Sequence, residues 1–129
     1  MGKLVNNLVL DAALDYIKQN GTQISVCIDT PTIYSHATTT DNKVLAIKSD
    51  LTNASYEAIG DGASGRMLTV KAAPTLAVVG AGTQNATHIC ICAAATNLLY
   101  VTTCTSQALV NGNTVTIPAW TIQISDPSA

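Results

Sequence analysis

The chain opens with a hydrophobic pattern typical of an amphipathic helix, from about Val5 to Asn20. Its apolar residues fall on two adjacent stripes at helical spacing, one at Leu4, Leu8 and Ala12 and the other at Leu10, Leu14 and Ile17. The remaining side is polar, at Asn7, Asp11, Asp15 and Lys18. Gly21 follows as a good C-terminal stop. We expect this helix to lay an apolar stripe on a sheet or on a partner.

Beyond Gly21 the period of the pattern changes from helical to two, as in a strand. The first strand alternates between two sets of positions, Ile24, Val26 and Ile28 against Gln23, Ser25 and Cys27. This alternation predicts a strand that is buried on one face only. Further strands are predicted at residues 44–47, 67–70, 76–79, 87–93, 98–103, 108–110, 114–117 and 120–124.

Two local signals predict how the last strands are connected. Asn111-Gly112-Asn113 lies between two apolar runs, and Asn and Gly tolerate the positive φ of tight turns, so residues 108–117 are predicted to form a hairpin. At Pro118 the alternation slips by one residue, which indicates a bulge or an edge bend. Trp120, the single large aromatic residue, is expected in the core.

The succession of short strands and turn signals, with no helix between strands to support a parallel sheet, predicts an all-β fold. We expect an antiparallel β-sandwich or jelly-roll-like barrel with one N-terminal α-helix. The pattern shows neither an internal repeat nor a linker. Residues 1–129 are therefore expected to form a single β-rich structural domain, with the helix at about 5–20 and strands from about 22 to 125.

The composition adds one unusual feature, a low content of charge. Charged residues make up 11% of the chain, against about 25% in typical soluble domains. Thr and Ala take their place, with 18 residues of each. A surface of hydroxyl and methyl groups costs little to desolvate, which suits broad contacts with neighbouring subunits. The alternative is an ordinary monomer with little charge.

The distribution of charge also argues against two classes of partner. The six basic residues are scattered, and clustered phosphate contacts are what nucleic-acid binding requires, so no nucleic-acid partner is expected. The longest apolar run near the N-terminus, residues 8–10, ends at Asp11 and is too short for a signal peptide or a spanning helix. We expect no membrane partner and a protein that stays in the cytoplasm until assembly.

The four cysteines, Cys27, Cys90, Cys92 and Cys104, include no C-x-x-C pair. Cys90 and Cys92 alternate along a predicted strand, so they share a face and are poorly placed to bond each other. We expect reduced, buried thiols. Neither the cysteines nor the two histidines have the spacing of a zinc site, and we expect no metal and no cofactor.

Gly60, Gly62 and Gly65 match the G-x-G-x-x-G fingerprint of dinucleotide-binding loops. In those folds the loop opens a helix, whereas here residues 66–70 have the pattern of a strand, so a hairpin is predicted instead. Ser64 lacks the spacing of a nucleophile elbow, and the loop aspartates suit turn formation. No catalytic residue is predicted, and we do not expect an enzyme.

The polar loop from Thr30 to Asn42 contains the pair Tyr34 and His36, which we take as a candidate partner-contact loop. Loops carry binding residues more often than strands do. A carbohydrate- or receptor-binding β module is therefore an alternative, and Tyr34 and Tyr56 are the aromatic residues that it could use.

The order of the elements is also informative. It comprises the helix at 4–20, residues 24–28, Pro31-Thr32-Ile33-Tyr34 with a Thr-rich stretch, residues 98–103, Ser106-Gln107-Ala108-Leu109, residues 111–117 and residues 122–127. This order resembles that of small virion structural proteins of tailed bacteriophages, in particular capsid decoration or cement proteins. No catalytic residue follows from the resemblance.

The resemblance implies a β domain on the outer face of the shell, located in the virion after assembly in the host cytoplasm. Its partners would be the major capsid protein lattice and further copies of itself, as a homo-oligomer. The segment from Met1 to about Asn7 would be a candidate arm. A tail, neck or fibre-associated subunit of the virion is the nearest alternative.

Overall fold

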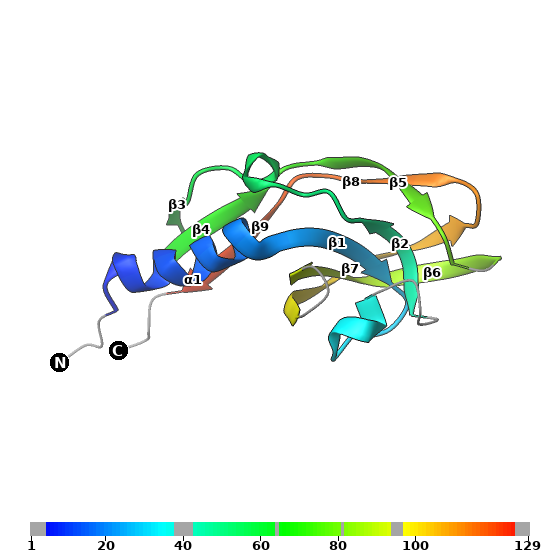
Figure 1. Cartoon of the computed structure of the whole chain (residues 1–129), viewed down its shortest axis with the longest axis horizontal. Coiled ribbons are helices and arrows are strands. Elements are labelled where there is room, and N and C mark those ends of the chain that lie inside the picture. Colours follow the sequence, from blue (N-terminus) through cyan, green and yellow to red (C-terminus); the bar gives the residue numbers. More distant parts are fainter. Residues whose placement is uncertain (1–4, 38–42, 64, 81, 94–96, 126–129) are drawn as a thin grey trace.

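The computed structural model describes residues 5–37, 43–63, 65–80, 82–93 and 97–125, and strands make up 56% of the described residues (Figure 1). Within these ranges the helices are α1 (Asn7–Asn20) and two short 3-10 helices, η1 (Tyr34–Ala37) and η2 (Asn53–Ser55). The strands are β1 (Gly21–Cys27), β2 (Val44–Lys48), β3 (Gly60–Gly62), β4 (Gly65–Val70), β5 (Ala73–Val78), β6 (Thr83–Ala93), β7 (Asn97–Val110), β8 (Thr114–Ile117) and β9 (Trp120–Ser125). The predicted mostly β architecture with one N-terminal α-helix is confirmed.

The strands form two antiparallel sheets. The larger has the order β7-β6-β1-β2-β5-β8, and the smaller has the order β3-β4-β9. The six-stranded sheet curls into a half-barrel, so that its two edge strands, β7 and β8, come round toward each other (Figure 1). The concave side of this curl holds the main hydrophobic core.

The predicted hairpin over residues 108–117 is wrong in its pairing, although the turn is present. Gly112 has a φ of +89°, and the Asn113 amide donates to the Val110 carbonyl at 3.1 Å. The strands on either side nevertheless do not pair with each other, since β7 pairs with β6 and β8 pairs with β5. Strand β6 provides a long partner for the 14 residues of β7, whereas β8 has four residues. The turn therefore connects the two edges of the curled sheet.

The irregularity predicted at Pro118 proves to be a change of sheet. Strand β8 ends at Ile117 in the six-stranded sheet, and β9 begins at Trp120 in the three-stranded sheet. The strand predicted from residue 76 begins three residues earlier, at Ala73, so that Pro74 lies within β5, where the pairing with β8 shifts register.

Helix α1 begins two residues later than predicted and is rotated so that a single stripe faces the protein. Asn6 caps it, with its Oδ1 accepting from the Leu8 amide at 2.8 Å. Leu10 and Leu14 are buried, whereas Leu8 is 76% exposed. The predicted stripe that contains Leu8 therefore faces away from the sheet, and Leu4 lies outside the described residues.

An ion pair also fixes α1 to the smaller sheet. The guanidinium of Arg66, on β4, binds both carboxylate oxygens of Asp11, with Nε–Oδ1 at 2.6 Å and Nη2–Oδ2 at 3.1 Å. Two parallel bonds of this kind fix both distance and orientation. Asp11 lies three residues from both Leu8 and Leu14, so this ion pair holds α1 against β4 without distinguishing the two stripes. Burial of Leu10 and Leu14 is what turns Leu8 outward.

Strand β1 is buried on both faces, which corrects the prediction of a half-buried strand. Gln23, Ser25 and Cys27 are buried together with Ile24 and Val26. The Gln23 Nε2 and the Ser25 Oγ each donate to the Ala37 carbonyl at 2.8 Å. Helix η1 thus covers the second face and satisfies its polar side chains.

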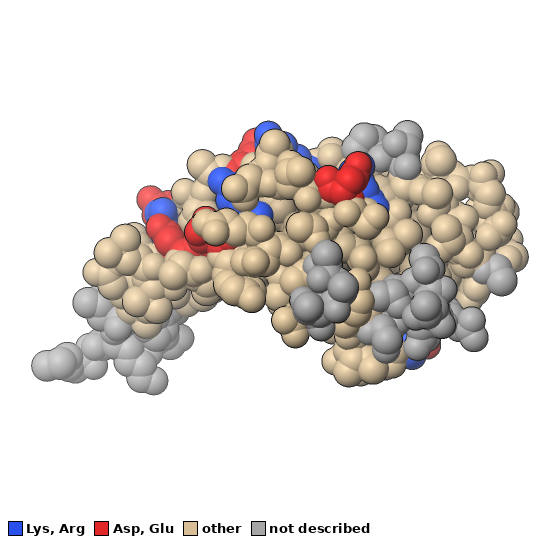
Figure 2. All heavy atoms as spheres, viewed as in Figure 1, with Lys and Arg blue, Asp and Glu red and all other residues tan. Residues whose placement is uncertain are grey.

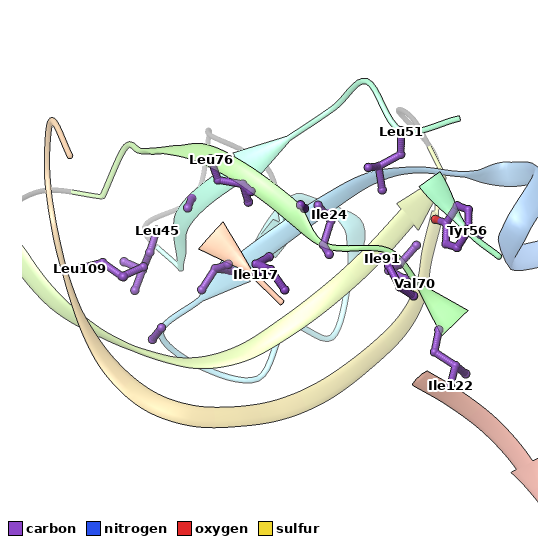
Figure 3. Close-up of a cluster of buried hydrophobic side chains, with 14 of the residues drawn as sticks. Ile24, Leu45, Leu51, Tyr56, Val70, Leu76, Ile91, Leu109, Ile117 and Ile122 are labelled. Carbon is purple, nitrogen blue, oxygen red and sulfur yellow. The ribbon is translucent and has the colours of Figure 1, made fainter. Parts of the chain in front are cut away.

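The main core fills the concave side of the half-barrel, and its side chains point toward one another from both sheets (Figure 3). The buried members labelled there are Ile24, Leu45, Leu51, Tyr56, Val70, Leu76, Ile91, Leu109, Ile117 and Ile122. Among them, Tyr56 is polar at its tip, and its hydroxyl donates to the Gly21 carbonyl at 2.6 Å. Burial raises the pKa of Tyr56 to about 12.

Candidate functional site

The candidate partner-contact loop is packed more closely than the sequence suggested. Tyr34 and His36 both belong to η1 and are half-buried. Tyr34 packs against a small second core that includes Cys27 and Ala37. The Nδ1 of His36 lies 3.3 Å from the Thr32 amide. Tyr34 thus helps to seat η1 on the sheet, whereas the His36 ring contacts the preceding loop. Residues 38–42 of the loop lie outside the described residues.

The glycine motif forms a hairpin, as predicted. Gly60 and Met67, Asp61 and Arg66, and Gly62 and Gly65 are opposed in the antiparallel pair β3–β4. Strand β4 continues directly from the motif, so the motif does not open a helix whose N-terminus could hold a phosphate. Ser64 lies outside the described residues.

Three of the four cysteines are buried free thiols, as predicted: Cys27, Cys90 and Cys92. Side-chain hydrogen bonds with Cys27 and Cys92, together with burial, raise the pKa of the Cys90 thiol. Within the described ranges, no three His, Cys, Asp or Glu residues are grouped as a metal site would require. Cys104 departs from the prediction because it is only partly buried.

The first feature with functional potential is an exposed apolar surface on α1. We call it the outer face of α1 and define it by five exposed residues, Leu8, Val9, Ala12, Ala13 and Tyr16. Leu8, Val9 and Tyr16 are 76%, 61% and 54% exposed. None of the five carries a charge, and the nearby Asp11 is paired with Arg66. Apolar residues grouped in this way usually mark an interaction site.

The surrounding surface also carries little charge. In the face shown in Figure 2, most acidic and basic atoms gather in one band, and the described remainder is almost entirely uncharged. Several charged residues are paired: Asp61 and Arg66 form an ion pair at 2.5 Å, as Lys48 and Asp50 do at 2.8 Å. Pairing leaves little net charge on this face to repel or attract a partner.

The second feature is a cavity of about 690 Å³ where the two edges of the curled sheet approach each other. We call it the seam cavity. Its walls come from β7 and from the segment running through β8 into β9, and its floor is formed by Val26, Ala86 and Ile89. Its walls comprise Thr102, Thr103, Cys104, Thr105, Gln107 and Leu109 on one side and residues 115–121 on the other.

An aromatic pair borders the seam cavity. The rings of Tyr100 and Trp120 stack, with centroids 5.9 Å apart and planes inclined by 28°. The Nε1 of Trp120 is buried and has no hydrogen-bond partner among the described residues. Trp120 therefore belongs to the edge of the core and to the cavity wall, which partly corrects its prediction as a core residue.

The sequence contained few signals for either feature. The outer face of α1 was visible in part as the apolar stripe with Leu8 and Ala12, but its direction depended on the packing of Leu10 and Leu14. The seam cavity was not visible, because β7 and β8 are adjacent in the sequence and were predicted to pair. The cavity lies between them because β7 pairs with β6 and β8 pairs with β5.

Comparisons with known proteins add no relationship to this description. No protein-family model, curated protein or solved structure matches the chain. Among the helices that the structure describes, none has the length and apolar character needed to cross a membrane. The outer face of α1 and the seam cavity are therefore the features from which we infer the function.

Proposed function

We propose that this protein is a structural subunit of a tailed-phage virion, most simply a capsid decoration or cement protein that binds the shell through the outer face of α1. The observation that carries the proposal is the exposure of Leu8, Val9 and Tyr16 on one uncharged helix face. The order of the elements, which resembles that of small structural proteins of tailed bacteriophages, supports a phage virion as the particle. The low charge of the chain supports a role in which broad surfaces are desolvated.

The strength of such a contact can be bounded. Full burial of a large apolar side chain contributes about 1.5–3 kcal/mol, and these three are already partly covered, so together they offer roughly 3–6 kcal/mol. Association itself costs at least about 4 kcal/mol in lost freedom of motion. One copy of the face therefore supports weak binding. Copies repeated over a symmetric lattice add their contributions, and this repetition is what a cement protein requires.

The expected partners are the major capsid protein lattice and further copies of the chain. A tail, neck or fibre-associated subunit would use the same face against a different neighbour, and it remains the nearest alternative. For a carbohydrate- or receptor-binding module, the described residues offer less support. Tyr34 is packed against the second core, and Tyr56 is 3% exposed.

We also infer that the curled six-stranded sheet and the smaller sheet together make an antiparallel β-sandwich or jelly-roll-like barrel. A structure of the assembled particle tests this, and a sheet that stays open there contradicts it.

Binding to shells tests the proposed interface. Shells assembled without this chain are mixed with the purified protein and sedimented, and the bound fraction is measured against concentration. We expect Val9→Lys to weaken binding at least about tenfold, because the contact would bury an unpaired ammonium group. Val79→Lys is the matched control, since Val79 is 43% exposed and lies outside α1.

The possible outcomes separate the interface from the function. Wild-type protein that does not bind shells refutes decoration. Equal binding by the two variants shows that another surface makes the contact. Electron microscopy of particles with this chain labelled decides the location, because label confined to the tail replaces decoration with the tail alternative.

A further inference from the structure

We infer that the seam cavity is a binding site for a neutral, mainly apolar small molecule that carries a hydrogen-bond acceptor. The inference is independent of the proposed structural role, because the cavity and the outer face of α1 share no residue. It rests on the size of the cavity, on the absence of charge in its described lining and on one unsatisfied donor at its wall.

The size and shape of the cavity suit a small molecule. Its volume of about 690 Å³ lies within the range of about 300–1,000 Å³ that is usual for ligand sites. Along the chain, the lining runs from Leu109 and Val115, which flank the turn at 111–113, to the Tyr100–Trp120 stack. The turn at 111–113 links these two walls covalently. The mouths of β-barrels hold ligands in the same way.

The lining selects a neutral ligand. None of the 16 lining residues is charged, and the floor is formed by aliphatic side chains. A charged ligand would lose its hydration without gaining an ionic partner, which is strongly unfavourable. Its polar side chains are uncharged: threonine hydroxyls, the Gln107 amide, the Cys104 thiol and the Trp120 indole. An aliphatic or aromatic body with few polar atoms therefore fits this lining best.

Thr102 and Cys104 place polar atoms on the inner side of β7. Thr102 is paired with Ile89, whose side chain packs against the main core, so both side chains lie on the concave face. The Thr102 hydroxyl has a weak bond, at 3.5 Å, to the Thr103 carbonyl. It is thus able to exchange that bond for one to a ligand. Cys104, two residues further along, also packs against the core from this face.

The unsatisfied donor is the indole N–H of Trp120. A buried N–H without an acceptor costs about 1–3 kcal/mol, which a ligand oxygen can recover. The atom is covered by protein in the structure, so the ring has to turn to present it. Its neighbour Tyr100 contacts the ring by stacking, so no hydrogen bond of the indole has to be broken for this movement.

Nile red, a neutral apolar dye with a carbonyl oxygen, is a suitable probe. Trp120 is the single tryptophan of the chain, so quenching of its fluorescence reports on the cavity directly. We expect saturable binding of one dye per chain, with a parallel rise in dye emission. Bound dye should also protect Cys104 from N-ethylmaleimide, because the other three cysteines are fully buried.

Three variants locate the binding site. Thr102→Tyr fills the cavity and should reduce dye affinity at least about tenfold, whereas Thr114→Tyr, on β8 but outside the lining, should leave it unchanged. Trp120→Phe keeps an aromatic ring and removes the N–H, so dye emission should report an affinity about tenfold lower. Circular dichroism and thermal unfolding establish that each variant is folded, and protection of wild-type Cys104 remains a test if one is not.

Several results would overturn the inference. They are dye binding that does not saturate, binding that Thr102→Tyr and Thr114→Tyr weaken equally, and Cys104 labelling that the dye does not slow. Loss of dye binding in Val9→Lys would place the dye on the outer face of α1 instead. Displacement of the dye as protein concentration rises, together with dimer formation, would assign the cavity to a second copy of the chain.

Discussion

The buried hydroxyl of Tyr56 makes the stability of this protein depend on pH in a way that one substitution should remove. Tyr56 is 3% exposed, and its hydroxyl donates to the Gly21 carbonyl at 2.6 Å. Burial raises the pKa of Tyr56 to about 12, from 10.0 in an exposed tyrosine. Between these two values the unfolded chain releases a proton that the folded protein retains. Rising pH therefore favours unfolding, and the contribution of this group is complete below pH 10 and lost as pH rises to 12.

The size of the effect follows from the shift. One pH unit above the ordinary pKa, the unfolded state gains about tenfold in population relative to the folded state, which is about 1.4 kcal/mol. The full shift corresponds to roughly 3 kcal/mol. At neutral pH, Tyr56→Phe loses the hydrogen bond to Gly21 and should cost about 1–2 kcal/mol. The two proteins should therefore become equally stable near pH 11, with the variant the more stable above it.

Urea unfolding followed by far-UV circular dichroism, at intervals from pH 7 to pH 11.5, measures both curves. The difference between the two proteins isolates Tyr56 from every other group that titrates in this range. Tyr16→Phe is the matched control, because Tyr16 is 54% exposed on α1, and its curve should follow that of the wild type. If the free energies of unfolding of wild type and Tyr56→Phe fall in parallel above pH 10, the phenol does not carry the dependence.

Two further pairs of substitutions test the packing around α1 by thermal or urea unfolding. Gly21→Ala should destabilise by about 1–3 kcal/mol, because a Cβ there would lie 2.5 Å from the Tyr56 Oη and 2.6 Å from the Ile17 carbonyl oxygen. Gly60→Ala meets nothing within 4 Å and should have little effect; equal losses would contradict the crowding at Gly21. Leu14→Ala should cost about 2–5 kcal/mol and Leu8→Ala less than about 0.5 kcal/mol, and the reverse order would mean that the other stripe faces the sheet.

The sequence by itself determined the local structure of much of the chain, because local structure depends on spacing and on turn chemistry. The four-residue spacing of Leu10 and Leu14, with Gly21 beyond it, was sufficient to predict α1. Alternation with period two was sufficient to predict that the rest is mostly β. The hairpin at Gly62–Gly65 followed from the strand pattern after it, and the turn at Gly112 followed from its residue types.

Only the tertiary structure decided which elements meet. Strand β7 pairs with β6 rather than with its neighbour β8, since a long partner satisfies more backbone groups than a short one. The same choice leaves the seam cavity between β7 and β8. Burial of β1 on both faces depends on η1, in which the Ala37 carbonyl accepts a hydrogen bond from Ser25. The periodicity of the sequence does not predict this contact.

The tertiary structure also decided which apolar stripe of α1 faces the sheet. Both of its apolar stripes satisfied the helical period, so the pattern could not say which of Leu8 and Leu14 would be buried. Packing makes the choice, because Leu14 belongs to the main core together with residues far along the chain, such as Leu68 and Ile122. Contacts of such long sequence separation exist only after the chain has folded. For that reason the outer face of α1 and the seam cavity, which carry both proposals, belong to the tertiary structure.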